Sequence, residues 1–92
     1  METCEHFQQA TVFQTDTRVC PECVDMGSSW VHLRMCLVCG HIGCCDNSPN
    51  KHATAHYRAT HDPVIRSIEP GEFWGYCYID DMFVDEVVAP SL

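Results

Sequence analysis

The sequence is poor in basic residues. Its 92 residues include five Lys and Arg against 13 Asp and Glu, which gives a formal net charge of −8. A surface this acidic repels phosphate groups, so we expect neither a nucleic acid nor an anionic membrane as the partner. The chain also lacks an apolar run long enough to span a membrane, and it begins without the basic and apolar regions of a signal peptide. These absences predict a cytoplasmic monomer that is attracted to basic protein or peptide surfaces.

The chain is also too short to be stabilised by a large hydrophobic core. A domain of this size buries roughly two thirds of the surface that its unfolded chain exposes. Eight cysteines and six histidines point to a further source of stability. Disulfides are the alternative, as in small secreted proteins, but they would leave the histidines unexplained. We therefore predict one domain over residues 1–92 that is held together by zinc.

Seven of these residues lie close together in the middle of the chain. Thiolate and neutral imidazole are the ligands that zinc prefers, and a Cys-x-x-Cys step brings two sulfurs to one ion. A tetrahedral ion takes four ligands, so this stretch predicts more than one site. The seven are Cys36, Cys39, Cys44, Cys45, His52, His56 and His61, and further ligands are available at Cys4, His6, Cys20, Cys23 and Cys77.

Spacing alone leaves the pairing of these ligands open. One alternative is a four-cysteine ribbon made of the pairs 20/23 and 36/39. Another is an exchange of Cys44 for its neighbour Cys45.

The hydrophobic pattern predicts an α+β fold. Residues 30–36 alternate between apolar and polar, which indicates a half-buried strand. Ser48 and Pro49 are typical of a helix start, and Asp62-Pro63 of its end, so we expect a helix up to about Thr60. Further strands are expected at 11–14, 64–68, 73–79 and 82–88. The prediction is a small zinc-stabilised domain in which an antiparallel sheet packs against one main helix.

The order of the ligands resembles the UBP-type zinc finger, also called the ubiquitin-binding BUZ finger. The segment at 43–48 is similar to the free-standing bacterial branch of that family. The resemblance runs nearly from end to end and rests on Cys4/His6, Cys20/Cys23, Trp30, Cys36/Cys39/Gly40, Cys44, His52/His56, His61 and the segment Tyr76-Cys77-Tyr78.

This resemblance implies an interleaved set of zinc sites. Its first site consists of Cys20, Cys23, Cys44 and His52, and its second of Cys36, Cys39, His56 and His61. A third ion would take Cys4, His6 and Cys77, with Asp80 in the place of the last family cysteine. The resemblance thus implies two zinc ions, and three if the Asp80 carboxylate binds zinc.

The resemblance also implies a function, which is to bind the free C-terminal Gly-Gly tail of ubiquitin or a similar protein or peptide without catalysis. Aromatic residues and an arginine hold such a tail and its carboxylate. Asp46 stands where the family has its arginine, and Arg34 replaces a family tryptophan. We expect Arg34 to bind the carboxylate, with Trp30, Trp74, Tyr76 and Tyr78 around the tail.

Three alternatives accompany this interpretation. The four aromatic residues could belong to the core, and the zinc could be purely structural. A zinc-dependent hydrolase is the third, although the sequence has no His-Glu-x-x-His motif to supply a general base.

Overall fold

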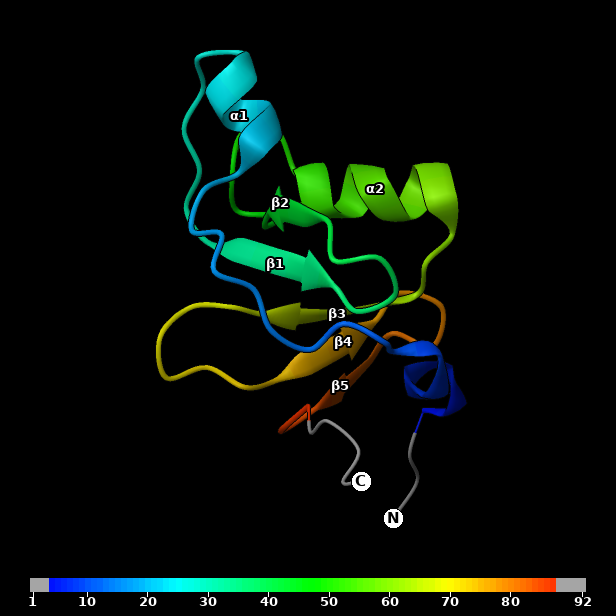
Figure 1. Ribbon diagram of the computed structural model, residues 1–92. Coiled ribbons are helices and arrows are strands. Elements are labelled where there is room, and N and C mark those ends of the chain that lie inside the picture. Colours follow the sequence, from blue (N-terminus) through cyan, green and yellow to red (C-terminus); the bar gives the residue numbers. More distant parts are fainter. Residues whose placement is uncertain (1–3, 88–92) are drawn as a thin grey trace.

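The structure is a computed structural model that describes residues 4–87. It confirms the α+β class, because one main helix lies beside a five-stranded antiparallel sheet (Figure 1). The strand order is β2-β1-β3-β4-β5. The strands are β1 (Leu33–Cys36), β2 (Ile42–Cys44), β3 (Val64–Ser67), β4 (Gly75–Cys77) and β5 (Met82–Val84).

The second half of the chain forms the expected antiparallel meander of β3, β4 and β5. The strands are shorter than the hydrophobic pattern predicts, and Val88, at the end of the last predicted strand, lies outside the described residues. The prediction of a strand at 11–14 is wrong. There the N–H groups of Thr11 and Val12 both donate to the carbonyl of Leu37, so the segment makes one contact with the sheet rather than a ladder.

The main helix is α2 (His52–Thr60), and it begins three residues later than expected. Its N-cap is Lys51, in the left-handed conformation. Ser48 is buried, and its hydroxyl accepts a hydrogen bond from the N–H of Val31 at 2.8 Å. The serine therefore fixes a loop next to β1 instead of capping the helix. The two shorter helices, η1 (Glu5–Gln9) and α1 (Pro21–Asp25), were not predicted.

The apolar core lies on one face of the sheet. Leu33, Met35 and Val64 are almost fully buried there, and the strand register places them on the same side. The N-terminal segment, blue in Figure 1, crosses the sheet from η1 toward α1, and Phe7 and Phe13 pack against the core. Helix α2 lies beyond the opposite face, above β1 and β2.

A glycine allows α2 to approach the sheet. A Cβ atom at Gly43, in β2, would lie 2.5 Å from the backbone nitrogen of Ala53 in α2. Because real Cβ atoms do not come this close to backbone, any larger residue would push the helix away. This contact fixes the positions of the two helical histidines relative to β2.

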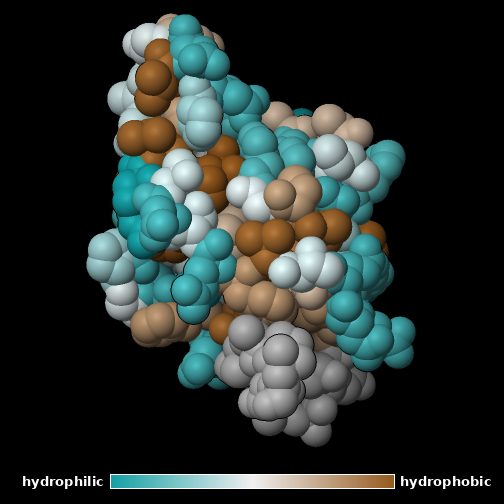
Figure 2. Space-filling view, viewed as in Figure 1, coloured by the Kyte–Doolittle hydropathy of each residue, from teal (hydrophilic) through white to brown (hydrophobic). Residues whose placement is uncertain are grey.

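Helix α1 has little apolar packing of its own. Cys23 is its only buried residue, while Val24 and Met26 are more than half exposed. Figure 2 shows this hydrophobic surface around α1. The helix therefore contacts the rest of the protein mainly through the side chains of Cys20, at its N-cap, and Cys23, within it. Within residues 4–87, no helix has the length and hydrophobicity that crossing a membrane requires.

Candidate metal centres and an aromatic pocket

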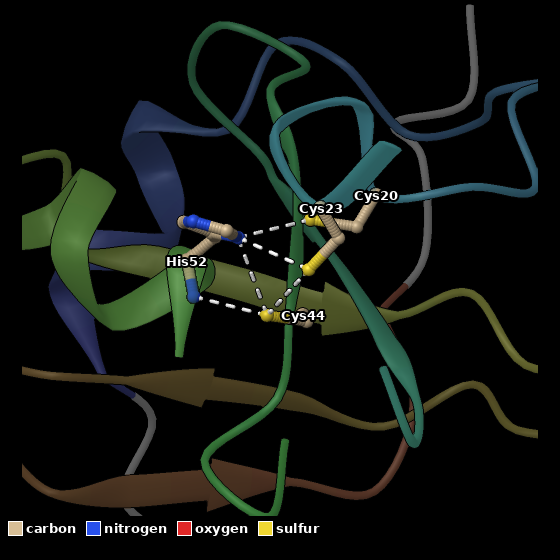
Figure 3. Close-up of side chains that lie close together, drawn as sticks. All are labelled: Cys20, Cys23, Cys44 and His52. Carbon is tan, nitrogen blue, oxygen red and sulfur yellow. Dashed lines mark hydrogen bonds between the residues drawn. The ribbon is translucent and has the colours of Figure 1, made fainter. Parts of the chain in front are cut away.

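The first candidate metal centre consists of Cys20, Cys23, Cys44 and His52. Figure 3 shows the three sulfurs gathered around the imidazole. Nδ1 of His52 lies 3.2 Å, 3.4 Å and 3.5 Å from the sulfurs of Cys20, Cys23 and Cys44. The three cysteines come from the start of α1 and the end of β2, and all three are 0% exposed.

These distances fit a shared zinc ion and exclude a disulfide. The sulfurs of Cys23 and Cys44 are 3.8 Å apart. Two thiolates bound to zinc at about 2.3 Å in a tetrahedron would be separated by roughly 3.8 Å. A disulfide would need about 2.05 Å. All eight cysteines have free thiols, so the disulfide alternative is wrong for this structure.

The surroundings of the first centre favour bound thiolates. The backbone N–H of His52 donates to the sulfur of Cys44 at 3.2 Å, and the side-chain amide of Asn50 donates to that of Cys23 at 3.7 Å. Burial raises the pKa of Cys20 to about 11. A thiol buried in this way needs a positive ion to lose its proton, and zinc supplies that charge.

The second candidate centre differs from the expected one by a single ligand. The structure groups Cys36, Cys39 and His56 with Asp62, and His61 is absent from the group. Nε2 of His56 lies 3.3 Å from the sulfur of Cys39 and 3.5 Å from Oδ2 of Asp62. That same carboxylate oxygen lies 3.5 Å from the sulfur of Cys36. Two thiols, one imidazole and one carboxylate form a complete ligand set for zinc.

The end of helix α2 explains why Asp62, and not His61, lies next to this group. His61 follows the last helical residue in the left-handed conformation, with φ of 62°, and is exposed. Its ring meets the edge of Tyr57 instead of the sulfurs. Asp62 directly precedes Pro63, where the chain must be extended, and this turn directs its carboxylate back toward Cys36.

Two neighbouring side chains support His56. The ring of His41 stacks on that of His56, with centroids 4.1 Å apart and planes within 6°. Nε2 of His41 in turn lies 2.6 Å from the carboxylate of Glu22. Burial lowers the pKa of His56, which favours the neutral imidazole that a metal ion needs.

The third candidate centre joins the two ends of the described chain. It contains Cys4, His6, Cys77 and Asp80. Nδ1 of His6 lies 3.4 Å from each sulfur and 3.0 Å from Oδ2 of Asp80, which is 2.9 Å from the sulfur of Cys4. Burial and the contact with Asp80 raise the pKa of Cys4 to about 12. The structure thus places Asp80 beside the three side chains that the resemblance assigns to a third ion.

The structure distinguishes Cys44 from Cys45. Cys44 faces the first centre, whereas the sulfur of Cys45 lies 3.4 Å from the hydroxyl of Ser48 and belongs to none of the three groups. The four-cysteine ribbon is not formed either, because the pairs 20/23 and 36/39 belong to different centres.

A pocket of about 390 Å³ lies on the face of the sheet that α2 partly covers. Its wall is a chain of aromatic rings from β4, β5 and their flanks. Phe83 contacts both Trp74 and Tyr76, with centroids 5.5 Å and 4.8 Å away, and Tyr76 meets Tyr78 edge to face. Trp30 does not line this pocket and packs against the core.

One positively charged side chain, that of Arg34, lines the pocket. The guanidinium of Arg34, from β1, lies 4.6 Å from the centre of the Trp74 ring. Its Nη1 donates to the carbonyl of Leu33 at 2.9 Å and lies 3.4 Å from the hydroxyl of Ser67. Among the described residues, Nε and Nη2 of Arg34 have no hydrogen-bond partner. These donors are available to an anion that enters the pocket.

The sequence of residues 20–89 matches the family described as "Zn-finger in ubiquitin-hydrolases and other protein". The match contains the ligands of the first two centres. The chain is a UBP-type zinc finger.

A solved structure is similar to most of this finger. It is the solution structure of protein RPA1320 from Rhodopseudomonas palustris, with 46% identity and a TM-score of 0.81. The likeness covers 92% of this finger and 83% of the bacterial chain. No curated protein matches the sequence.

Sequence reasoning missed several residues of this zinc finger. Asp62 was noted only in the helix-stop signal Asp62-Pro63, and the family's histidine was expected at His61. Asp46 was noted only as the substitute for the family arginine, and it now lines the pocket together with Asp81 and Phe83. No pattern in the sequence indicates Asp81 or Phe83. Asp81 reaches the pocket from the turn between β4 and β5, and Phe83 from β5 itself.

Proposed function

We propose that this zinc finger is a non-catalytic module, stabilised by zinc at all three centres, that binds the C-terminal tail of a protein or peptide. The observation that carries the proposal is Arg34, whose guanidinium lines a pocket walled by aromatic rings. A ubiquitin-like tail ending in Gly-Gly fits this description, because glycines have no side chains to hinder close contact with aromatic rings.

The ligand sets support a structural role for the metal. Each of the three groups offers four protein ligands, which is the full tetrahedral set of a structural zinc ion. A catalytic zinc ion keeps one position for water or substrate. Thiols in this number also require a reducing compartment, which favours the cytoplasm.

The stacked position of Arg34 suits it to binding a carboxylate. The ring of Trp74 holds the guanidinium plane, and the bond to Leu33 fixes one of its edges. The other edge can form paired hydrogen bonds with a terminal carboxylate. Because the aromatic chain is already packed, little order has to be gained when the tail binds.

Fluorescence polarisation with labelled peptides tests the proposal. A peptide that ends in Gly-Gly with a free carboxylate should bind. The same peptide with an amidated end should bind with an affinity lower by about tenfold or more. The Arg34→Ala variant should lose affinity for the free-acid peptide by a similar factor. Arg18→Ala is the matched control, because Arg18 is exposed and bonded only to its own loop.

Zinc content and the dispersion of the NMR spectrum show whether Arg34→Ala is still folded. If the folded variant binds the free-acid peptide as tightly as the original protein, Arg34 does not hold the carboxylate. If no C-terminal peptide binds the original protein, the finger is a purely structural zinc domain.

A further inference from the structure

The second metal centre contains the most accessible cysteine of the protein. All eight cysteines lie within the described residues, and Cys39 is the one among them that is exposed. It lies in the turn that follows β1, and its sulfur is 3.3 Å from Nε2 of His56. A small oxidant in solution can therefore reach Cys39 while the domain is folded.

A second sulfur of the same centre lies close to Cys39. Cys36, the last residue of β1, is 2% exposed, and the four ligand atoms of this centre all lie within 4.8 Å of one another. The backbone N–H of Gly40 donates to the carbonyl of Cys36 at 2.9 Å, which closes the turn that contains Cys39. The two sulfurs of a disulfide are about 2.05 Å apart, so a small movement of this turn is enough to join Cys36 to Cys39.

The cysteines of the other two centres are less accessible. Cys20 and Cys23 have the same spacing as the pair 36/39, but both are 0% exposed, as is Cys44. In the third centre, Cys4 and Cys77 are also buried, and they come from opposite ends of the described chain. The oxidation of a cysteine is favoured by its thiolate character and its exposure. An oxidant should therefore attack the second centre first.

We infer that the second centre is a site of reversible oxidation, at which a hydroperoxide converts Cys36 and Cys39 to a disulfide and the centre loses its zinc ion. Zinc, when bound, keeps both sulfurs as thiolates. The thiolate of Cys39 attacks one oxygen of hydrogen peroxide, so that an S–O bond forms, the O–O bond breaks and hydroxide leaves. The product is a sulfenic acid.

The second step uses the neighbouring sulfur. The thiolate of Cys36 attacks the sulfur of Cys39, so that an S–S bond forms, the S–O bond breaks and a second hydroxide leaves. Two electrons have then passed from the two sulfurs to the peroxide. The centre keeps only His56 and Asp62 as ligands, which is too few to hold zinc firmly.

The charge and the fold of the protein suit this reaction. Hydrogen peroxide is uncharged, so the formal net charge of −8 does not repel it. The first centre keeps its ligands, so the domain should stay folded after the second ion is lost. A thiol reductant reverses the disulfide by exchange and makes the centre available to zinc again. The inference rests on the proposed zinc ion at the second centre.

Native mass spectrometry before and after a brief exposure to hydrogen peroxide tests the inference. The zinc count should fall by one ion per domain, and the second centre should lose its ion at least about tenfold faster than the other two. Peptide mapping after alkylation should show a disulfide between Cys36 and Cys39, with Cys20 and Cys23 still reduced. Dithiothreitol and added zinc should restore the original count.

Two variants identify the thiol that reacts. Cys39→His keeps a ligand for zinc and removes the exposed thiol. It should lose zinc in peroxide about tenfold more slowly than the original protein. Cys45→Ser is the matched control, because Cys45 is buried beside Ser48 and belongs to none of the three groups. It should leave the rate of zinc loss unchanged.

The outcomes separate this inference from the proposed function. A protein that keeps all its ions in peroxide, or in which the pair 20/23 is oxidised as fast as the pair 36/39, would overturn the inference and leave the binding function standing. If iodoacetamide alkylates Cys39 at the rate of a free thiol before any oxidation, the second centre holds no zinc, which would contradict the proposed role of zinc there as well. The disulfide is mapped in the original protein, so the result does not depend on the folding of Cys39→His.

Discussion

The first metal centre and the two that contain an aspartate carry the same formal charge and differ in their surroundings. With Zn²⁺, three thiolates and an imidazole sum to 2 − 3 = −1, and two thiolates, an imidazole and a carboxylate sum to 2 − 2 − 1 = −1. The cysteines of the first centre are fully buried, whereas Cys39 in the second and Asp80 in the third are exposed.

The first centre therefore differs from the other two in having a third thiolate in place of a carboxylate, and in being closed to water. Thiolate is the softer ligand and the one better suited to zinc in a dry site. The first centre also joins α1 to β2 and α2, and α1 has almost no other buried contact. We expect the first centre to contribute most to the stability of the fold, and the other two, which each include one exposed ligand, to contribute less.

The strongest test of this difference is His52→Ala. Losing one of four ligands in the buried centre should remove most of a zinc contribution on the order of 10 kcal/mol, so the domain should be unfolded. NMR dispersion and circular dichroism measure the result. His61→Ala is the control, since His61 belongs to none of the centres. A well-dispersed spectrum of His52→Ala would contradict the proposed role of the first centre.

The next largest effect is expected at the second centre. Asp62→Ala should lower zinc affinity there by about tenfold or more, and the domain should stay folded because the first centre is intact. Native mass spectrometry during titration with a chelator would show one ion leaving earlier than in the original protein. The comparison with His61→Ala decides the ligand: if His61→Ala releases the ion and Asp62→Ala does not, the assignment of Asp62 is wrong.

The third centre can be made more like the first. Asp80→Cys would give it three thiols and one imidazole, and we expect its zinc affinity to rise by about tenfold, because thiolate replaces carboxylate at a partly exposed position. Chelator competition measures the change. Asp80→Asn should instead weaken the site, and a rise in affinity for both variants would show that Asp80 is not a ligand.

The smallest predicted difference is in the effect of pH. Without the ion, the pKa values of Cys20 and Cys4 are raised to about 11 and about 12, so these thiols hold their protons at neutral pH and release them when zinc binds. Zinc affinity therefore falls as pH falls. The first centre has three thiols to deprotonate and each of the other two centres has two. For each pH unit, zinc affinity at the first centre should therefore change by about tenfold more than at the other two. Equal slopes at all three centres would contradict these ligand sets.

The sequence predicted the part of the site that depends on local spacing. Each Cys-x-x-Cys pair faces one ion position, and the two helical histidines are in contact with sulfurs, as the resemblance implied. In the structure Asp62 lies beside Cys36, Cys39 and His56 where His61 was expected, because a left-handed turn at the end of α2, which spacing does not reveal, turns His61 away.

The sheet was predicted in part for a similar reason. The apolar alternation of β3 to β5 is local, and it gave the meander. The pairing of β1 with β2 and β3 joins distant segments, and β2 is a three-residue strand containing Gly43 with no alternating pattern. Ser48 carries the signal of a helix cap, but a tertiary bond to Val31 engages its hydroxyl instead.

The interleaving of the centres along the chain has a consequence for the order of folding. Cys20 and His52 are 32 residues apart, Cys36 and Asp62 are 26 apart, and the first two loops overlap. Closing the loop from Cys20 to His52 fixes Cys44 and His52. Because both residues lie between Cys36 and Asp62, this closure shortens the free chain that the second loop must order. Cys4 and Asp80 are 76 residues apart. Their closure costs the most entropy when it comes first, so the two ends of the chain should meet last, after the inner loops have brought them together.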